Sequence, residues 1–211
     1  MDKAEYEYRF NNYDKKNIIK LIKQHGGKLK YPKRLMKISV YHHPNNKKNF
    51  YIRVRNEGSY ITMTVKKKYK TKQFEDEYEI VVDNYEEANN ILKLLGCKLK
   101  YYVEKFRETW ELSGCKEVVF DEYPAASEYM EVECNTKKKL DATIKKLGLT
   151  QKDRWNGGLG DLYLELYGIS KNNRKSGNLS FMQAKKNLYS YVKKNKKLFN
   201  DTLKEQKDLL N

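Results

Sequence analysis

Eight segments of this chain alternate between apolar and polar residues with a period of two, the repeat of a β-strand that buries one face. They are rich in Tyr, Val, Ile and Thr and are separated by turn residues such as Asn45-Asn46 and Glu57-Gly58. The segments span residues 3–10, 35–43, 49–56, 59–68, 74–82, 98–112, 116–123 and 128–134. Eight strands of this kind predict an antiparallel barrel or sandwich.

Helical patterns interrupt the strands and follow them. Residues 14–25, 84–95 and 136–147 each carry apolar residues on one helical face, and a glycine follows each segment. A short helix is predicted over 161–167 and a longer one over 180–210. We interpret Gly157-Gly158-Leu159-Gly160 as a turn without function, because no strand precedes it and no GK[ST] follows.

The composition excludes several classes of protein. With 211 residues, 39% of them hydrophobic and 13% aromatic, the chain is long and apolar enough to bury a core. No segment has the roughly 18 apolar residues of a membrane span, and residues 1–10 lack a signal-peptide core, so we expect a cytoplasmic protein. Cys97, Cys115 and Cys134 lack CxxC spacing, which predicts small apolar side chains rather than a disulfide framework or a zinc site.

The charge is strongly positive, with 44 Lys and Arg against 28 Asp and Glu. Residues 170–211 alone hold 11 Lys and Arg but three Asp and Glu. A basic protein of this kind usually binds an anionic partner. The lysine-rich face of the predicted C-terminal helix is more often a solvated surface than a nucleic-acid contact, but RNA is a candidate partner there.

The charges within the strands are sorted by sign. Residues two apart in a strand share one face, so each pair forms a row of like charge. The basic rows are Arg53 with Arg55, Lys66 with Lys68, and Lys105 with Arg107, and Arg9 adds a cation to the first strand. The acidic rows are Glu5 with Glu7, Glu77 with Glu79, and Glu131 with Glu133, and Asp121 ends the seventh strand.

Two architectures fit these rows. Alternation alone favours a sandwich whose apolar faces meet in the core while the charged rows face water. Each row holds charges of a single sign, and this argues for an arrangement in which the rows face inward. Neighbouring like charges repel unless an opposite charge lies between them. If the rows line a cavity, a triphosphate with roughly four negative charges and about two divalent cations would neutralise them.

The order of these motifs resembles that of the CYTH domain, the superfamily of triphosphate tunnel metalloenzymes. Glu5-Tyr6-Glu7-Tyr8-Arg9 is similar to its opening ExExK signature, with arginine in place of the usual lysine. The later motifs follow in the family's order: Arg53-Val54-Arg55, Lys66-Lys67-Lys68, Glu77-Tyr78-Glu79, Lys105-Phe106-Arg107, Asp121 and Glu131-Val132-Glu133. The likeness spans about residues 3–149 and favours the inward-facing arrangement.

The resemblance implies an α+β fold in which an eight-stranded antiparallel β-barrel forms a tunnel, with helices packed outside and a helical C-terminal extension. We expect a tunnel domain over residues 1–169 and a basic extension over 170–211. The family implies a metal-facing set of Glu5, Glu7, Asp121, Glu131 and Glu133. Its phosphate clamp would comprise Arg9, Arg53, Arg55, Lys66, Lys68, Lys105 and Arg107. Glu5, Glu7, Arg9, Lys105 and Arg107 would be the catalytic subset, whereas Glu77 and Glu79 either orient cations or contact metal.

The expected activity is metal-dependent hydrolysis of the terminal phosphate of a triphosphate, with Mg²⁺ or Mn²⁺ as cofactor, two ions being expected. Candidate substrates are tripolyphosphate, nucleoside or thiamine triphosphate, and RNA 5′-triphosphate. A class IV-type adenylyl cyclase and a non-catalytic polyphosphate or nucleic-acid binding barrel are the alternatives. The sequence assigns no oligomeric state.

Overall fold

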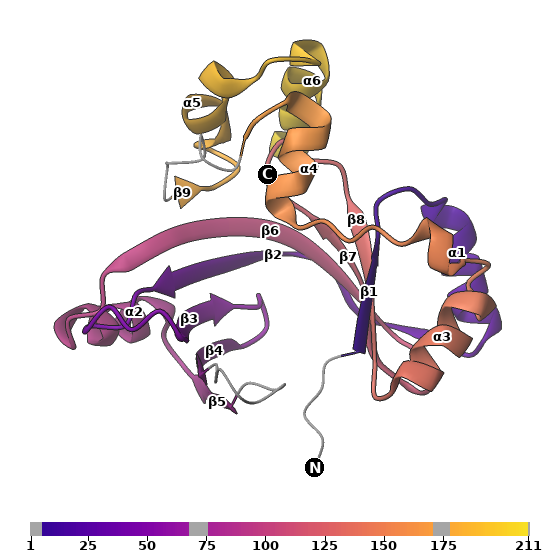
Figure 1. The fold of residues 1–211 in the computed structure, drawn as a ribbon, viewed down its shortest axis with the longest axis horizontal. Coiled ribbons are helices and arrows are strands. Elements are labelled where there is room, and N and C mark those ends of the chain that lie inside the picture. Colours follow the sequence, from indigo (N-terminus) through magenta and orange to yellow (C-terminus); the bar gives the residue numbers. More distant parts are fainter. Residues whose placement is uncertain (1–5, 68–75, 171–177, 211) are drawn as a thin grey trace.

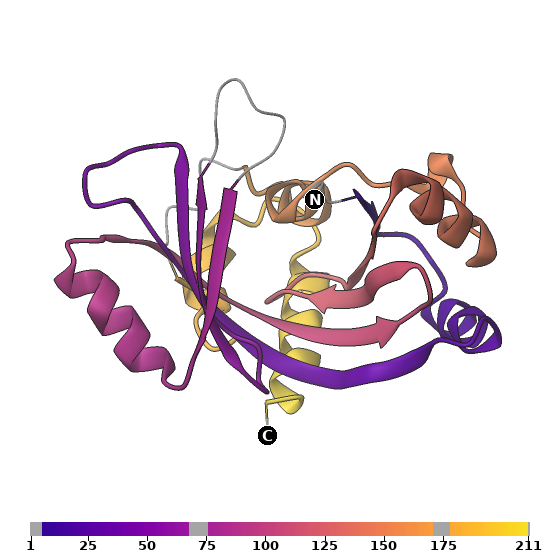
Figure 2. The same ribbon diagram turned by 90° about the horizontal axis from the view of Figure 1, so that it is seen from below.

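The computed structural model describes residues 6–67, 76–170 and 178–210, and its centre is one antiparallel sheet. Eight strands follow one another in the order β1 (Tyr6–Phe10), β8 (Tyr129–Cys134), β7 (Cys115–Glu122), β6 (Leu99–Glu111), β2 (Lys28–Tyr41), β3 (Phe50–Asn56), β4 (Ile61–Lys67) and β5 (Asp76–Val82). The sheet is strongly curved, so that β3–β5 and β1 form opposite walls (Figures 1 and 2). The predicted α+β antiparallel class is confirmed. Within the described residues β1 and β5 do not pair, so the sheet is open at its edges.

Three helices cover the outer face of the sheet, as the sequence predicts. They are α1 (Lys15–Gln24), α2 (Tyr85–Leu94) and α3 (Lys137–Lys146), and the side chains of Asp14, Asn84 and Thr136 cap their N-termini. α1 and α3 pack against Tyr8, Phe120 and Val132, and α2 packs against Ile52 and Val54. These apolar residues alternate with the charged rows, which leaves the charges on the inner face.

After α3, η1 (Gln151–Asp153) lies beside β1 and α3, where Gln151 donates to Tyr8 and Asp141. The chain from residue 159 onward forms a second layer beside the sheet (Figure 1). It contains α4 (Leu159–Tyr167), β9 (Asn178–Leu179), α5 (Ala184–Leu188), η3 (Tyr189–Tyr191) and α6 (Lys196–Asp208). β9 pairs with β6 in parallel, and Phe199 and Leu203 of α6 join one hydrophobic cluster with Ile38 and Val103 of the sheet. The layer is therefore anchored to the sheet by a strand pairing and by a shared core.

Hydrogen bonds from this layer hold the turn between β7 and β8. The Ala125 amide donates to Gln206 Oε1 (2.7 Å), and the Tyr163 and Tyr167 hydroxyls donate to the carbonyls of Pro124 and Ala125 (both 2.5 Å). Ala125 and Gln206 are almost fully buried. Since buried backbone groups without partners are costly, the turn depends on residues far along the chain for its stability.

Two predictions about secondary structure are wrong. The single helix expected over 180–210 is broken: α5 and η3 end at Tyr191, and α6 begins after Asn195, which has a left-handed backbone (φ 55°). The break lets Leu188 and Phe199 both reach the shared core. β2 begins at Lys28 rather than Leu35. Its pairing with β6 shifts register between Leu29 and Tyr31 and again between Tyr31 and Arg34, the stretch that contains Pro32, which has no N–H to donate.

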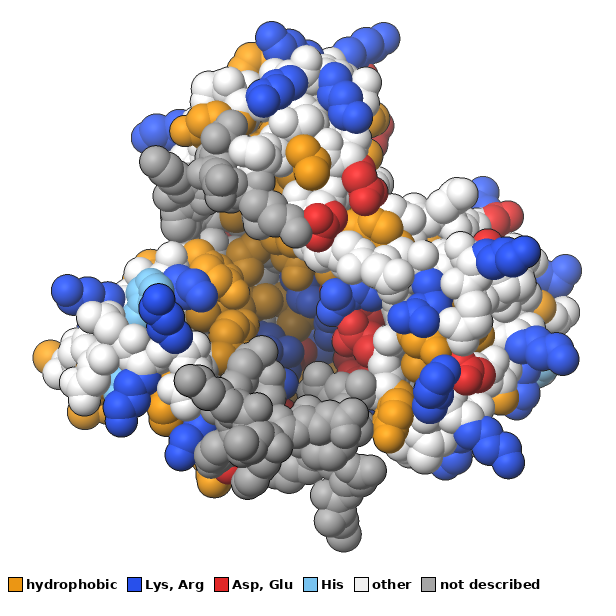
Figure 3. Space-filling model, viewed as in Figure 1, with side chains coloured by type: hydrophobic (Ala, Val, Ile, Leu, Met, Phe, Trp, Pro, Cys, Tyr) orange, Lys and Arg blue, Asp and Glu red, His pale blue; other side chains and the backbone are white. Residues whose placement is uncertain are grey.

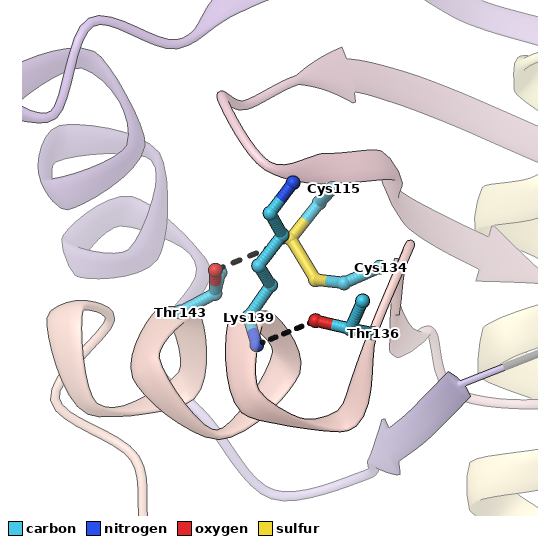
Figure 4. Close-up of a disulfide and its surroundings, with 5 residues drawn as sticks. All are labelled: Cys115, Cys134, Thr136, Lys139 and Thr143. Atoms are coloured by element: carbon cyan, nitrogen blue, oxygen red, sulfur yellow. Dashed lines mark hydrogen bonds between the residues drawn. A yellow bond between two sulfur atoms is a disulfide. The ribbon is translucent and has the colours of Figure 1, made fainter.

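The interpretation of all three cysteines as apolar fillers is also wrong. Cys115 and Cys134 lie opposite each other on β7 and β8 and form a disulfide, and only Cys97 is free and buried among the described residues (Figure 4). Thr143 of α3 lies within hydrogen-bonding distance of Cys115 Sγ, at 3.2 Å. The disulfide is a covalent link between the two strands that carry Asp121 and Glu131.

The helices of the described chain are short. None of them has the length and apolar composition needed to cross a lipid bilayer.

Candidate active site

The β3–β5 wall of the sheet brings the basic and acidic rows of three strands into register. Arg53 lies opposite Thr64, which lies opposite Glu79, and the next row joins Tyr51, Lys66 and Glu77. Side chains at paired positions point to the same side of the sheet. Basic rows of β3 and β4 therefore face the same space as the acidic row of β5.

The opposite wall, made by β6, β7, β8 and β1, is assembled in the same way. Arg107 pairs with Asp121, Glu131 pairs with Arg9, and Glu133 pairs with Glu7. Lys105 lies two residues before Arg107 and therefore shares its face.

The two walls enclose a polar cavity of about 560 Å³. The predicted residues that line it are Glu7, Arg9, Arg53, Arg55, Lys66, Glu77, Glu79, Lys105, Arg107, Glu131 and Glu133. Asp121 lies behind the lining and is fully buried. Figure 3 shows basic and acidic side chains gathered in the hollow of the molecule. The predicted residues Glu5 and Lys68 lie outside the described residues.

Asp121 is the centre of a buried ion-pair network. It accepts hydrogen bonds from Lys105 Nζ and from Nε and Nη2 of Arg107, each at 2.6 Å. Burial alone would raise the pKa of Asp121, but Arg107 and Lys105 outweigh it and lower this pKa to about 2. Burial and the neighbouring Arg107 lower the pKa of Lys105, whereas the carboxylates raise that of Arg107. Asp121 thus fixes two cations in place.

Glu131 joins Arg107 to Arg9. Its Oε2 accepts from Arg107 Nη2 at 3.2 Å and its Oε1 from Arg9 Nε at 2.7 Å. Arg9 also forms an ion pair with Glu7 at 2.6 Å. Although burial opposes the charged form, Glu131 and Glu7 raise the pKa of Arg9 above its ordinary value. The arginine at this position of the opening motif is therefore an integral part of the cavity wall.

The β3–β5 wall has less compensation for its cations. Arg53 Nη2 lies 3.3 Å from both Thr64 Oγ1 and Glu79 Oε2, but its buried Nε has no hydrogen-bond partner among the described residues. Burial and the neighbouring Arg53 lower the pKa of Arg55, and the carboxylate of Glu57 opposes this effect only in part. Lys66 forms an ion pair with Glu77 at 3.3 Å. Glu77 and Glu79 both form ion pairs with cations in this structure.

The acidic side chains have the donor chemistry for a hard divalent cation. Glu7, Glu133 and Glu117 occupy adjacent register positions on β1, β8 and β7. Carboxylate oxygens are the usual ligands of Mg²⁺, and Mn²⁺ accepts them too. Both Asp121 oxygens, in contrast, are held by cations. In the described part of the chain, no group of three or more Asp, Glu, His or Cys side chains is arranged to hold a metal ion.

The structure adds residues that the sequence analysis did not identify. Glu57, treated as a turn residue, is 4% exposed and forms ion pairs with Arg55 and Arg34. Glu117 pairs with Arg107 at 3.2 Å and lies four residues before Asp121, a same-face spacing that could have revealed it. Arg34 offered no such signal, because it precedes the part of β2 that the alternation predicts.

The glycine-rich segment, which the sequence analysis interprets as a turn without function, lies beside the cavity. Gly158 and Leu159 line the polar cavity, and the Gly157 carbonyl lies 3.5 Å from Arg9 Nη1. A Cβ atom on Gly157 would lie 2.4 Å from the Trp155 ring, so a larger residue does not fit there.

Comparisons with known proteins agree with this arrangement. The family model of the CYTH domain matches residues 4–154, so this chain belongs to the CYTH domain family. No curated protein matches it in sequence. Similar solved structures include a protein of Pyrococcus horikoshii, with 21% identity, a TM-score of 0.60 and coverage of 75% of this chain and 99% of that one. A putative adenylate cyclase from Vibrio parahaemolyticus has 12% identity and a TM-score of 0.64, and the match covers 77% of this chain and 98% of that one. At these identities the structures show a shared fold.

Proposed function

We propose that this protein is a divalent-metal-dependent triphosphatase that releases the terminal phosphate of a triphosphate-containing substrate. The observation that carries the proposal is the convergence of six basic side chains on one cavity that also holds carboxylates: Arg9, Arg53, Arg55, Lys66, Lys105 and Arg107. Membership of the CYTH domain family, which includes triphosphatases, supports the same activity.

The basic side chains would hold the phosphate chain between the two walls. Arginine guanidinium groups bind phosphate oxygens in pairs, and Lys66 and Lys105 add compact charges. Because the buried Nε of Arg53 has no partner among the described residues, a phosphate oxygen at β3 would satisfy this donor. Arg9, Lys105 and Arg107 would contact phosphate from the other wall, and Lys68 is the seventh residue of the predicted clamp.

The carboxylates Glu7 and Glu133 are the residues best suited to hold the metal, with Glu131 beside them and with Glu5 and Asp121 completing the predicted set. When bound, Mg²⁺ or Mn²⁺ supplies Lewis acidity and lowers the pKa of a bound water. Hydrolysis forms a bond between water oxygen and the terminal phosphorus while the bridging oxygen leaves with the diphosphate. In such transfers, positioning and charge neutralisation account for most of the rate acceleration.

Phosphate release from a panel of substrates tests this activity. Tripolyphosphate, ATP, thiamine triphosphate and a 5′-triphosphorylated RNA are incubated with the full chain and Mg²⁺ or Mn²⁺, and at least one is expected to release phosphate until a chelator is added. Glu131→Gln should reduce turnover at least 100-fold, while Glu86→Gln, on the exposed side of α2, should not change it. Binding without turnover for every substrate would instead favour the non-catalytic barrel.

The products formed from ATP separate hydrolysis from cyclisation. ADP and phosphate are expected, whereas cyclic AMP and pyrophosphate would support the class IV-type cyclase, the activity named for the Vibrio parahaemolyticus structure.

The exposed lysines of α6 are the proposed contact for an RNA 5′-triphosphate, and charge removal there should lower activity on RNA alone. A cytoplasmic location is also proposed, and a disulfide between Cys115 and Cys134 that persists in the cell would argue against it.

A further inference from the structure

A second cavity adjoins the polar one and has a different character. It has a volume of about 410 Å³ and is lined mainly by aromatic and aliphatic side chains. Four residues line both cavities and form the passage between them: Ile38, Tyr51, Tyr123 and Leu159. Figure 3 shows hydrophobic side chains beside the charged cluster in the same hollow. A substrate could therefore occupy both cavities at once.

The inner face of the sheet changes from apolar to basic along individual strands. On β6, Val103 lines the second cavity, and Lys105, two residues later on the same face, lines the polar one. On β3, Tyr51 lies at the passage and Arg53 follows it on the same face. On both strands, the residue toward the second cavity is apolar or aromatic, and the next residue on the same face, toward the polar cavity, is a proposed phosphate-binding residue.

The roof of the second cavity comes from the C-terminal layer. Leu159 and Gly160 of α4, Leu179 of β9 and Leu188 of α5 line it. All four of these residues lie beyond residue 154, where the family match ends. β9 attaches this layer to the sheet, because Leu179 pairs with Val103 of β6. Glu104 strengthens this attachment, because it accepts from the Tyr102 hydroxyl (2.6 Å) and from the Phe181 amide (2.9 Å).

From these observations we infer that the second cavity binds the organic part of the substrate, and that the substrate class is a triphosphate ester of a flat heteroaromatic group rather than inorganic tripolyphosphate. Pockets that recognise such groups are mostly apolar and have volumes of about 300–1,000 Å³. The rings of Tyr51, Tyr101 and Tyr123 offer faces for stacking and hydroxyls for polar edges. This inference rests on the proposed function, since it requires the phosphate chain to lie in the polar cavity.

The test compares kcat/KM between substrates and then truncates Tyr101, one of the aromatic side chains that line the second cavity. The ratio of kcat/KM for ATP or thiamine triphosphate to that for tripolyphosphate should be at least about 10, the effect of one stacked ring. A preference for either ester supports the inference and identifies the group. Tyr101→Ala should lower the ratio at least about tenfold, and Tyr101→Phe, which keeps the ring, should preserve it. Tyr78→Ala, which removes a tyrosine 67% exposed on β5, should leave the ratio unchanged.

Two further measurements keep the inference separate from the triphosphatase proposal and from folding. Val103→Phe fills the cavity instead of emptying it and should lower the ratio as Tyr101→Ala does. Calorimetric binding of ATP and of tripolyphosphate in the presence of a chelator tests the second cavity even if no substrate is hydrolysed. Equal affinity for the two compounds, or a ratio that neither Tyr101→Ala nor Val103→Phe changes, would overturn the inference.

Discussion

The two walls of the polar cavity carry similar charges but differ in how those charges are balanced. On the β6–β8 wall, the fully buried Asp121 accepts three short hydrogen bonds from Lys105 and Arg107. On the β3–β5 wall, Arg53 and Arg55 are adjacent cations, and the side chain of Glu79, which faces Arg53, is 37% exposed. The first wall is neutralised by a fully buried carboxylate, whereas on the second wall the partner of Arg53 is partly exposed and the buried Nε of Arg53 has no hydrogen-bond partner among the described residues.

This difference suggests that the β6–β8 wall contributes mainly to stability and the β3–β5 wall mainly to ligand binding. A buried, hydrogen-bonded ion pair holds its members in one geometry whether or not a ligand is bound. An arginine whose buried donor has no partner in the described structure, such as Arg53, gains most when a phosphate enters, because that donor is then satisfied. We therefore expect substitutions on the two walls to affect different properties, and the largest effect to be on stability.

Asp121→Asn should be the most damaging substitution. It leaves Lys105 and Arg107 buried beside a neutral group, and the loss of one partner from a buried ion pair costs about 3–5 kcal/mol in the free energy of unfolding. Chemical denaturation monitored by tryptophan fluorescence measures it. Glu79→Gln, the matched change on the other wall, should cost less than about 1 kcal/mol. Equal losses at the two sites would remove the distinction between the walls.

Arg53→Ala should mainly weaken substrate binding. A hydrogen bond to a charged group contributes about 1.5–3 kcal/mol, so KM for the best substrate should rise about tenfold or more while the unfolding transition stays close to wild type. Arg154→Ala serves as the control, because Arg154 does not line the cavity. A variant that loses stability instead of affinity would show that Arg53 is structural.

Acid should destabilise the protein through Asp121. Its folded-state pKa of about 2 lies below the ordinary value of 3.8, so the stabilisation is complete above the ordinary value and is lost as pH falls toward the folded value. Linkage gives a loss on the order of 2 kcal/mol between pH 5 and 2. Unfolding temperatures of wild type and Asp121→Asn across this range measure it, and the two pH profiles should converge at low pH. Parallel profiles would assign the acid sensitivity to other groups.

The smallest effect is expected from a pair of threonines on β4. The fully buried Thr64 donates to Glu79 at 2.6 Å, so Thr64→Val should cost about 1 kcal/mol in unfolding free energy. Thr62 is its control, because Thr62 Oγ1 is buried without a hydrogen-bond partner in the described structure, and Thr62→Val should be neutral or stabilising. Denaturant titrations of both variants compare them, and the opposite order would contradict the hydrogen bonding described for this wall.

The sequence predicts most of the sheet because a period of two is a local signal. Arg53-Val54-Arg55 and Glu131-Val132-Glu133 each show which side of their strand is polar, and the observed register brings both rows to one cavity. Whether those rows face water or a cavity is not a local property, and only the family resemblance decided it. The chemical role of each row remains a prediction.

The parts that the sequence did not predict depend on contacts between distant segments. Glu57 follows a strand and resembles any turn residue until Arg34 and Arg55 converge on it. Lys193-Lys194-Asn195 contains no glycine or proline, so the break before α6 is marked locally only by Asn195, a residue type that tolerates a left-handed backbone. The pairing of Cys115 with Cys134 follows from the register of β7 and β8, which spacing alone does not fix.

The hydrogen bonds between Gln206 and the turn at Ala125 determine when the cavity is completed during protein synthesis. Gln206 holds the turn at Ala125 across 81 positions of the chain, and Tyr123, just before that turn, lines both cavities. The ribosome delivers every strand of the curved sheet before it delivers this glutamine. A nascent chain therefore carries an unfinished pocket until α6 emerges, and acquires its affinity for substrate late, after its sheet has been translated.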